Sequence, residues 1–273
     1  MQARSASGSG VTPRVVITGI TGTLGESLGR HYREAGSEVI GVSRRPGEAD
    51  EAGEACTRRV ANAQRDAADA RALLDLDPDL LFLVAGQIEE ELGEGGMPLA
   101  RTTIEVVSIN QLFPSLVAIE AAARPRARRL DVIAVGSIAD GAPSCFGPVY
   151  HASKIGLHHF YTGVAPIAFE HNPKVRLRLY RPGAIQGPLA WAPVRRLNDR
   201  GRRIRARRVE GAPEGARVAA HLARFAESDR WVGTWDEPIS FQLLKLLFGM
   251  APNLYARLQQ AGWRRGSRFA GRS

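Results

Sequence analysis

The sequence predicts an α/β protein built on a single doubly wound parallel sheet with helices on both faces. Segments with strand character alternate with helical segments along most of the chain, which is the order that a parallel sheet requires. The strand-like segments, such as Val15–Ile17 and Leu80–Val84, are continuously apolar, as expected of strands covered on both faces. No internal repeat and no linker divides the 273 residues, a length that suits one large domain.

Apolar and β-branched runs place the strands, and turn residues place the ends of the helices. Strands are expected at residues 14–18, 38–43, 58–61, 80–84, 130–135, 175–180 and 231–235. A first helix is expected after the turn at residues 19–25 and continues to about residue 35. Further helices are expected at residues 64–76, 101–124, 150–169 and 214–227. Gly36 and Pro78 end the first two helices. Pro166 is expected to kink or end the fourth, because proline removes a helical N–H group.

Composition assigns the ends of the chain and its compartment. Residues 1–13 are small and polar, which predicts a flexible tail, and the folded domain is expected over residues 14–260. The chain has two cysteines, Cys56 and Cys145, which form neither a disulfide framework nor a metal site. With no signal-like apolar start and no apolar run of membrane-spanning length, we expect a cytoplasmic protein.

The net charge of +9 comes almost entirely from arginine. Much of this charge is scattered along the chain, so we do not expect nucleic-acid binding. Two clusters stand out from the background, one at residues 195–208 and one in a basic tail at residues 261–273.

The segment Thr18–Gly25, between the first strand and the first helix, is typical of a phosphate-binding turn. Its glycines allow a tight turn and a close approach to a pyrophosphate, while the N–H groups at the start of the helix face the anion. An ordinary strand-to-helix turn is the alternative. The expected cofactor contacts here are Gly19, Thr21, Gly22, Thr23, Leu24 and Gly25.

The second strand ends in Ser43-Arg44-Arg45. A site for NAD usually has an acidic residue at this point, to hold the ribose 2′-hydroxyl. Arg44 and Arg45 are instead suited to a 2′-phosphate, because a guanidinium matches phosphate geometry. The sequence therefore favours NADP over NAD, with a solvated basic turn as the alternative.

Tyr150 and Lys154 are four residues apart on an expected helix, so they lie on one face, one turn apart. The lysine charge is expected to lower the pKa of the phenol from about 10 toward neutrality. A phenol tuned in this way can exchange a proton with a carbonyl or alcohol oxygen.

With these pieces placed, the chain resembles the short-chain dehydrogenase/reductase family. The resemblance covers about residues 14–189, and a weaker similarity continues to residue 235. Its parts, in order, are Thr18–Gly25, Val84-Ala85-Gly86, Asn110, Ser137, Tyr150-x-x-x-Lys154 and Arg181-Pro182-Gly183.

The resemblance implies a Rossmann-like fold and a role for each matching position. Tyr150 would be the general acid or base, and Lys154 its pKa partner and a holder of the nicotinamide ribose. Ser137 would steady the substrate oxygen, and Asn110 would position a relay water beside Lys154. The implied backbone contacts to the cofactor are Ala85, Gly86, Pro182 and Gly183.

Two features depart from the family pattern. Gly19, Gly22 and Gly25 are evenly spaced, which is commoner in the extended and atypical branches, yet about 90 residues follow Gly183, which is short for an extended member. Val84 also stands where an asparagine is frequent. Neither departure touches the proton-transfer residues.

The resemblance places a lid over the substrate at about residues 187–212, and eight arginines fall within it. They suit an anionic or carrier-bound substrate, or equally a basic loop without a ligand. The apolar helix expected at residues 238–258 suits a core helix, an oligomer contact or peripheral contact with a membrane, and the first two are favoured.

The leading hypothesis is an NADPH-dependent oxidoreductase, a ketoreductase that converts a small-molecule ketone to a secondary alcohol. A nucleotide-sugar epimerase or dehydratase with retained NAD is the first alternative, suggested by the glycine spacing. A non-catalytic NADP-binding redox sensor is the second, suggested by the arginine-rich lid. The family resemblance further implies a homodimer or homotetramer that pairs through two long helices.

Overall fold

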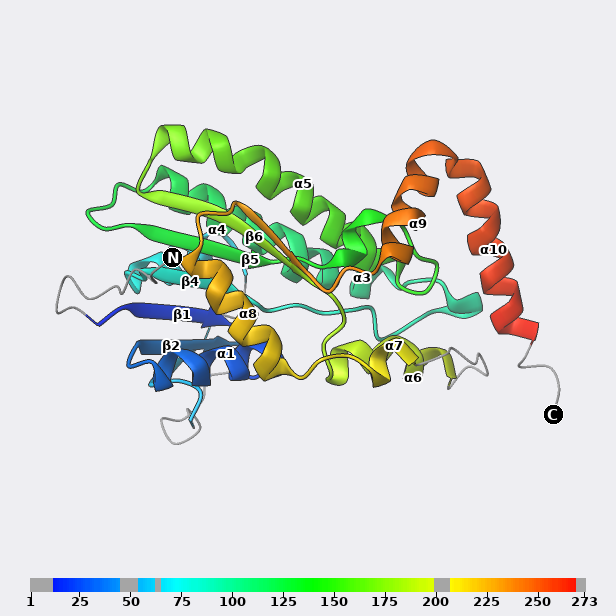
Figure 1. The fold of residues 1–273 in the computed structure, drawn as a ribbon, viewed down its shortest axis with the longest axis horizontal. Helices are drawn as coiled ribbons and strands as arrows, with labels where there is room; N and C mark the ends of the chain where they lie inside the picture. Colours follow the sequence, from blue (N-terminus) through cyan, green and yellow to red (C-terminus); the bar gives the residue numbers. More distant parts are fainter. Residues whose placement is uncertain (1–11, 45–53, 62–64, 199–206, 269–273) are drawn as a thin grey trace.

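A seven-stranded parallel sheet forms the centre of the computed structural model, which describes residues 12–44, 54–61, 65–198 and 207–268 (Figure 1). The strand order is β3-β2-β1-β4-β5-β6-β7, which confirms the doubly wound fold. The strands are β1 Arg14–Thr18, β2 Glu38–Ser43, β3 Arg58–Ala61, β4 Leu80–Leu83, β5 Leu130–Val135, β6 Val175–Pro182 and β7 Val232–Trp235. All seven expected strands occur, with small differences at their ends.

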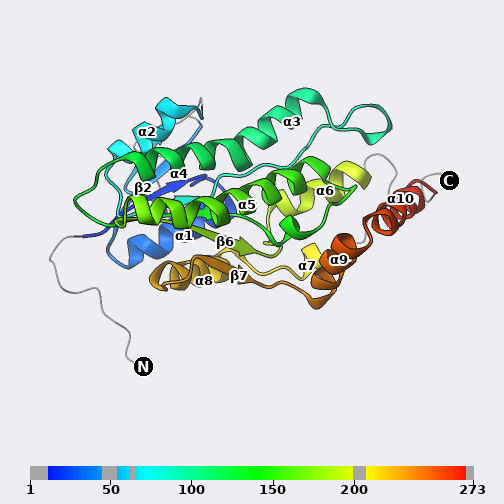
Figure 2. The same cartoon turned by 90° about the horizontal axis from the view of Figure 1, so that it is seen from above.

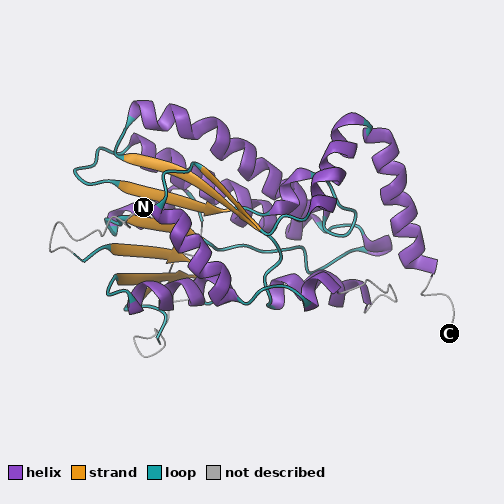
Figure 3. Cartoon of the chain, viewed as in Figure 1, coloured by secondary structure: helices purple, strands orange, loops and turns teal. Residues whose placement is uncertain are grey.

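Helices cover both faces of this sheet (Figures 2 and 3). Helices α1 (Thr23–Glu34) and α8 (Gly215–Glu227) pack together on one face. Helices α2 (Ala67–Asp75), α4 (Phe113–Ala123) and α5 (Pro148–His171) cover the other. Neighbouring residues of β1 serve opposite layers, since Val15 and Ile17 join the core under α1 and α8 and Val16 joins the core under α2, α4 and α5.

The long helix expected at residues 101–124 is interrupted. It runs as α3 (Ala100–Val107), a π-helical turn η3 (Ser108–Leu112) and α4. Single π turns are rare in proteins, but those that occur are often found at functional sites. This one carries Asn110. Among the described residues, the run Ala100–Ala123 is the one helix whose length and apolar composition would allow it to cross a membrane, and half of its most apolar window is buried inside the fold.

Helix α5 continues past Pro166 to His171, so the proline does not end it. Pro166 is exposed, and water can therefore solvate the carbonyl group that loses its helical partner.

The C-terminal region differs from expectation. Instead of one helix there are two, α9 (Ile239–Met250) and α10 (Pro252–Arg268), and the second takes in most of the expected basic tail. Pro252 at the first position of α10 explains the break, because its fixed φ angle starts a helix but its ring disrupts a preceding one. No residue of α9 is buried, so its assignment as a core helix is wrong.

The expected lid contains α6 (Pro188–Asn198) and α7 (Arg207–Glu210). Most of its arginines lie in residues 199–206, outside the described part of the chain, or have side chains that are not described. Arg195 is exposed and donates a hydrogen bond to the carbonyl oxygen of Pro188.

Candidate active site

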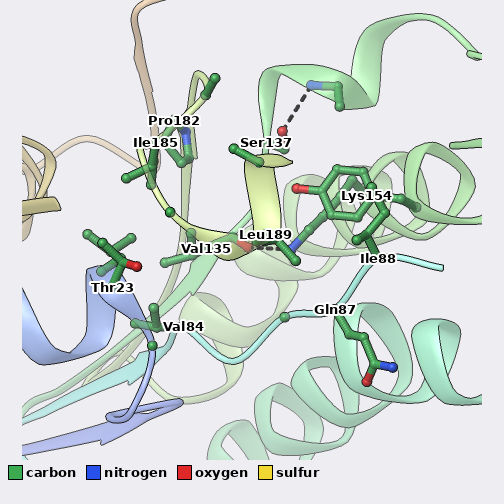
Figure 4. Close-up of a pocket in the computed structure, with 18 of the residues that line it drawn as sticks. Thr23, Val84, Gln87, Ile88, Val135, Ser137, Lys154, Pro182, Ile185 and Leu189 are labelled. Atoms are coloured by element: carbon green, nitrogen blue, oxygen red, sulfur yellow. Dashed lines mark hydrogen bonds between the residues drawn. The ribbon is translucent and has the colours of Figure 1, made fainter. Parts of the chain in front are cut away.

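A cavity of about 930 Å³ lies where the carboxyl ends of the parallel strands meet, as expected for a doubly wound sheet (Figure 4). All but two of the predicted site residues line it. They are Gly19, Thr21, Gly22, Thr23, Leu24, Gly25, Arg44, Ala85, Gly86, Ser137, Tyr150, Lys154, Pro182 and Gly183. The exceptions are Asn110, which lies behind the wall, and Arg45, which falls outside the described residues.

The glycine turn is packed too tightly for side chains. Gly19 has a φ of 71°, and a Cβ atom there would come within 2.8 Å of the Ala85 backbone. A Cβ on Gly25 would collide with the carbonyl group of Gly19. Gly22, the N-cap of α1, has no side chain to accept from the first-turn N–H groups. These groups therefore face the cavity, and the turn fits the pyrophosphate of a dinucleotide.

Two arginines line the nucleotide end of this cavity, Arg44 after β2 and Arg65 before α2. Burial, and then the neighbouring charge of Arg44, lower the pKa of Arg65. Among the described residues, the buried Nη1 atom of Arg65 has no hydrogen-bond acceptor. A pair of cations with an unsatisfied buried donor fits an anionic group.

Arg65 was not among the predicted site residues. The family resemblance also implies an acidic contact to the adenine after the third strand, for which Asn62 and Asp66 are the candidates. Asn62 lies outside the described residues, and the Asp66 side chain accepts from Asp69 N as the N-cap of α2. A single arginine between two elements gives no sequence pattern, so the position of Arg65 became evident only from the fold.

Tyr150, Lys154 and Ser137 all line the cavity, and Figure 4 shows Lys154 and Ser137 on its wall. The Lys154 Nζ atom donates to the carbonyl oxygen of Val135 at 2.9 Å and lies 5.7 Å from the centre of the Tyr150 ring. Ser137, at the end of β5, accepts from Ala139 N at 3.1 Å and also forms a side-chain hydrogen bond with Tyr150. The phenol, the hydroxyl and the ammonium thus converge on one region of the cavity wall.

The electrostatics of this group differ from expectation. Burial raises the pKa of Tyr150, and its hydrogen bond with Ser137 offsets part of that effect. Burial also lowers the pKa of Lys154, from 10.5 to about 8. The expected depression of the phenol pKa is therefore wrong for this structure, because burial is the largest effect and the lysine N–H is directed at Val135.

Asn110 is buried in the π turn and is fully engaged with protein groups. Its Nδ2 atom donates to the carbonyl oxygen of Gln87 at 2.8 Å and to Ser153 Oγ at 3.0 Å, while its Oδ1 atom accepts from Gln87 N at 2.9 Å. Ser153 in turn donates to the carbonyl oxygen of Tyr150 at 2.7 Å. Asn110 thus connects the segment after β4 to the second turn of α5.

Glu89 is a site residue that the sequence did not reveal. Its carboxylate is fully buried, accepting from Val149 N at 3.0 Å with one oxygen and from Tyr150 N at 3.1 Å with the other. These are first-turn N–H groups of α5, where a negative charge is stabilising. The sequence contains three consecutive glutamates at this point, and no spacing rule distinguishes Glu89 from Glu90 or Glu91.

A buried ion pair lies behind the site. Arg181 makes two 2.5 Å hydrogen bonds to the Asp140 carboxylate, and His158 Nδ1 lies 2.9 Å from the same group. Burial raises the pKa of Asp140, but the hydrogen bonds from His158 and Arg181 outweigh it and hold the pKa below its ordinary value. This cluster joins the loop after Ser137, helix α5 and the end of β6.

We predict that Glu89→Gln lowers the free energy of unfolding by about 1–3 kcal/mol, because an amide leaves one buried N–H group without an acceptor. Urea unfolding monitored by circular dichroism measures the change. The neighbouring Glu90→Gln is the matched control, since Glu90 is exposed, and its effect should stay within about 0.5 kcal/mol. Equal effects of the two variants would contradict the capping role.

The shifted pKa of Lys154 predicts a pH dependence of stability. The folded chain releases the lysine proton near pH 8 and the unfolded chain near pH 10.5. Between these values the unfolded state binds more protons, so this residue makes the fold more stable as pH rises. The unfolding free energy of the wild type should therefore rise relative to that of Lys154→Met between about pH 8 and about pH 10.5. Parallel curves for Lys154→Met and wild type would refute the shift.

Known proteins match this fold and its N-terminal two thirds. Residues 13–196 match the family model described as short chain dehydrogenase. A search of curated proteins finds no match. Among solved structures, a short-chain dehydrogenase from Streptomyces avermitilis is 17% identical with a TM-score of 0.64, and the match covers 95% of this chain and 98% of that chain.

Two further structures contain a nicotinamide cofactor. A short chain dehydrogenase from Burkholderia cenocepacia in complex with NADP has a TM-score of 0.69 at 15% identity, covering 90% of this chain and 97% of that chain. A 3-ketoacyl-(acyl-carrier-protein) reductase from Brucella melitensis complexed with NADH has a TM-score of 0.64 at 19% identity, covering 81% and 95%. At these identities the likeness shows the shared fold.

The family match spans the glycine turn, Ser137, Tyr150 and Lys154, and the strands β1 to β6. The chain belongs to the short-chain dehydrogenase family and is an NAD(P)(H)-dependent oxidoreductase.

Proposed function

We propose that this protein reduces a ketone to a secondary alcohol with NADPH, and that Tyr150 supplies the proton. The observation that carries the proposal is the convergence of the Tyr150 phenol, the Ser137 hydroxyl and the Lys154 ammonium on one cavity, which the glycine turn also lines. NADPH supplies a hydride to the carbonyl carbon when it is bound. The residues of the chain have to bind the ketone oxygen, orient it and deliver a proton to it.

The proton transfer uses neighbouring side chains. Ser137 donates a hydrogen bond to the ketone oxygen, which polarises the carbonyl group. As the oxygen gains electron density, the O–H bond of Tyr150 breaks and its proton moves to that oxygen, leaving a phenolate. The nearby Lys154 ammonium stabilises the phenolate until a proton is restored from solvent. The raised pKa of free Tyr150 keeps the phenol protonated at neutral pH, which suits the direction of reduction.

The preference for NADP rests on Arg44 and Arg65. Both side chains line the cavity, and β2 is followed by Arg44 where a site for NAD usually has an acidic residue that holds the ribose 2′-hydroxyl. A 2′-phosphate between the two guanidinium groups would neutralise their mutual repulsion and satisfy the buried Nη1 donor of Arg65.

The described part of the substrate end is mainly apolar. Its lining includes Ile88, Phe146, Leu189, Pro193 and Phe241, with few polar groups. No arginine among the described residues lines this end, so an apolar ketone is the better fit than the anionic substrate suggested by the arginine-rich lid.

We retain pairing through the long helices as the proposed homo-oligomer contact, because Leu112 next to α4 and Ile167 on α5 are exposed.

We predict that Arg65→Ala and Arg44→Ala each weaken NADPH binding by about tenfold or more and change NADH binding little, because each removes a charge-assisted contact to the 2′-phosphate. Fluorescence titration of both nucleotides measures the ratio. Arg71→Ala is the matched control, since Arg71 is exposed on α2 and pairs with Glu120. Equal affinity of the wild type for both nucleotides would contradict the preference, and tightly retained NAD after purification would favour an epimerase.

We predict that Tyr150→Phe lowers kcat/KM by about 100-fold or more while NADPH affinity stays nearly unchanged, because only the transferred proton is lost. The assay follows nicotinamide oxidation across a panel of apolar ketones. Tyr161→Phe, also on α5 but away from the cavity, should retain turnover. Turnover by Tyr150→Phe would overturn the assignment of the acid, and a wild type that binds NADPH but reduces no ketone would favour a redox sensor.

A further inference from the structure

Helix α9 exposes a narrow apolar face. Ile239, Leu243, Leu246 and Met250 follow a helical repeat of four, three and four residues, which places them on one side of the helix. Their exposed fractions are 74%, 60%, 58% and 76%. Scattered exposed apolar residues need no explanation, but four large ones in a single row mark an interaction surface.

The opposite face of α9 is occupied by the fold. Phe241 lines the cavity, Lys245 pairs with Glu237 and lies 3.9 Å from Asp140, and Phe248 packs edge-on against Tyr255 with ring centres 5.4 Å apart. These contacts set the rotation of the helix about its axis. The exposed row is therefore the outward face of a well-anchored helix.

Helix α10 likewise has an inner side that contacts the fold and an outer side that is exposed. Its inner side carries Tyr255, which donates to the carbonyl oxygen of Pro143 at 2.6 Å, and Trp263, which packs against Phe146. Leu254 and Leu258, half exposed, lie on its outer side with the exposed Arg257 and Arg264. Leucines and arginines thus share one outward surface.

We define the docking face as Ile239, Leu243, Leu246 and Met250 of α9 with Leu254, Arg257, Leu258 and Arg264 of α10. The two helices lie together at one end of the molecule, beyond the sheet (Figures 1 and 2). Nothing else in the described part of the chain combines so many exposed apolar side chains with arginines.

The charge of this region selects its partner. No aspartate or glutamate follows Glu237 in the sequence, whereas the outward-facing Arg257 and Arg264 do, followed by Arg265, Arg268 and Arg272. A symmetric contact between two copies would place this basic surface against itself, with no acidic side chain on either hairpin to offset the repulsion. An anionic lipid surface accepts both the apolar row and the arginines.

We infer that the docking face binds the surface of an anionic lipid bilayer, with α9 and α10 lying in the plane of the interface. Helix α9 has 12 residues, a length of about 18 Å that cannot cross a hydrocarbon core of about 30 Å. The apolar row enters the boundary between headgroups and acyl chains, and the arginines contact lipid phosphates.

Vesicle sedimentation with the full chain tests this inference. The probes are phosphatidylcholine vesicles with and without an equal amount of phosphatidylglycerol. The wild type should sediment with the anionic vesicles, and high salt should weaken binding to them because it screens the arginines. Loss of sedimentation with anionic vesicles, or equal binding to both kinds, would overturn the inference.

Variants locate the contact. Leu243→Asp with Leu246→Asp should reduce binding to anionic vesicles at least tenfold, and Trp231→Asp, which changes an exposed apolar residue just before β7, should not. Arg257→Gln with Arg264→Gln, two exposed positions of the docking face, should also reduce binding several-fold. NADPH binding by each variant verifies that it is folded. If both double variants still bind the vesicles, the assignment of the docking face is refuted. The assignment is also refuted if the wild type does not bind vesicles but forms a dimer in gel filtration that Leu243→Asp with Leu246→Asp abolishes.

Discussion

The buried Glu89 carboxylate accepts from two N–H groups in the first turn of α5, and the register of that helix determines the geometry of the site. Tyr150 lies in this first turn and Lys154 one turn later, with Ser153 between them bonded to Asn110. Because the side chains share one rigid helix, they keep fixed positions relative to one another. Contacts from three other segments, at Glu89, Asn110 and Asp140, then fix the helix relative to the sheet.

The two charged regions around the cavity differ in how their charges are satisfied. Asp140 is buried behind the site, but Arg181 and His158 meet both of its oxygens, so the pair needs no ligand. At the nucleotide end, the positive charge of Arg44 lies close enough to Arg65 to lower its pKa. The buried Nη1 donor of Arg65 has no acceptor among the described residues. The first arrangement is structural. The second favours an anion, which is why it supports a phosphorylated cofactor.

Local patterns in the sequence were sufficient to predict the strands, their parallel arrangement and fourteen of the residues that line the cavity. Continuous apolar runs such as that of β5 indicate burial on both faces of the strand. The four-residue spacing of Tyr150 and Lys154 places them on one helix face even when the predicted helix boundaries are slightly wrong. Glu89 and Arg65 could not be found in this way, since their roles depend on which segments the fold brings together. The direction of the Tyr150 pKa shift was also wrong from sequence, because burial is a property of the whole site.

Lys245, the one charged residue of α9, points inward to Glu237 and Asp140. This ion pair and the aromatic contact of Phe248 hold the helix in a single rotational setting before any partner arrives. A surface that is already oriented loses little conformational entropy on binding, so more of its contact energy is expressed as affinity. The helix whose outer side is thus preorganised also lines the cavity through Phe241, so a surface bound to that outer side would also restrain the wall of the cavity.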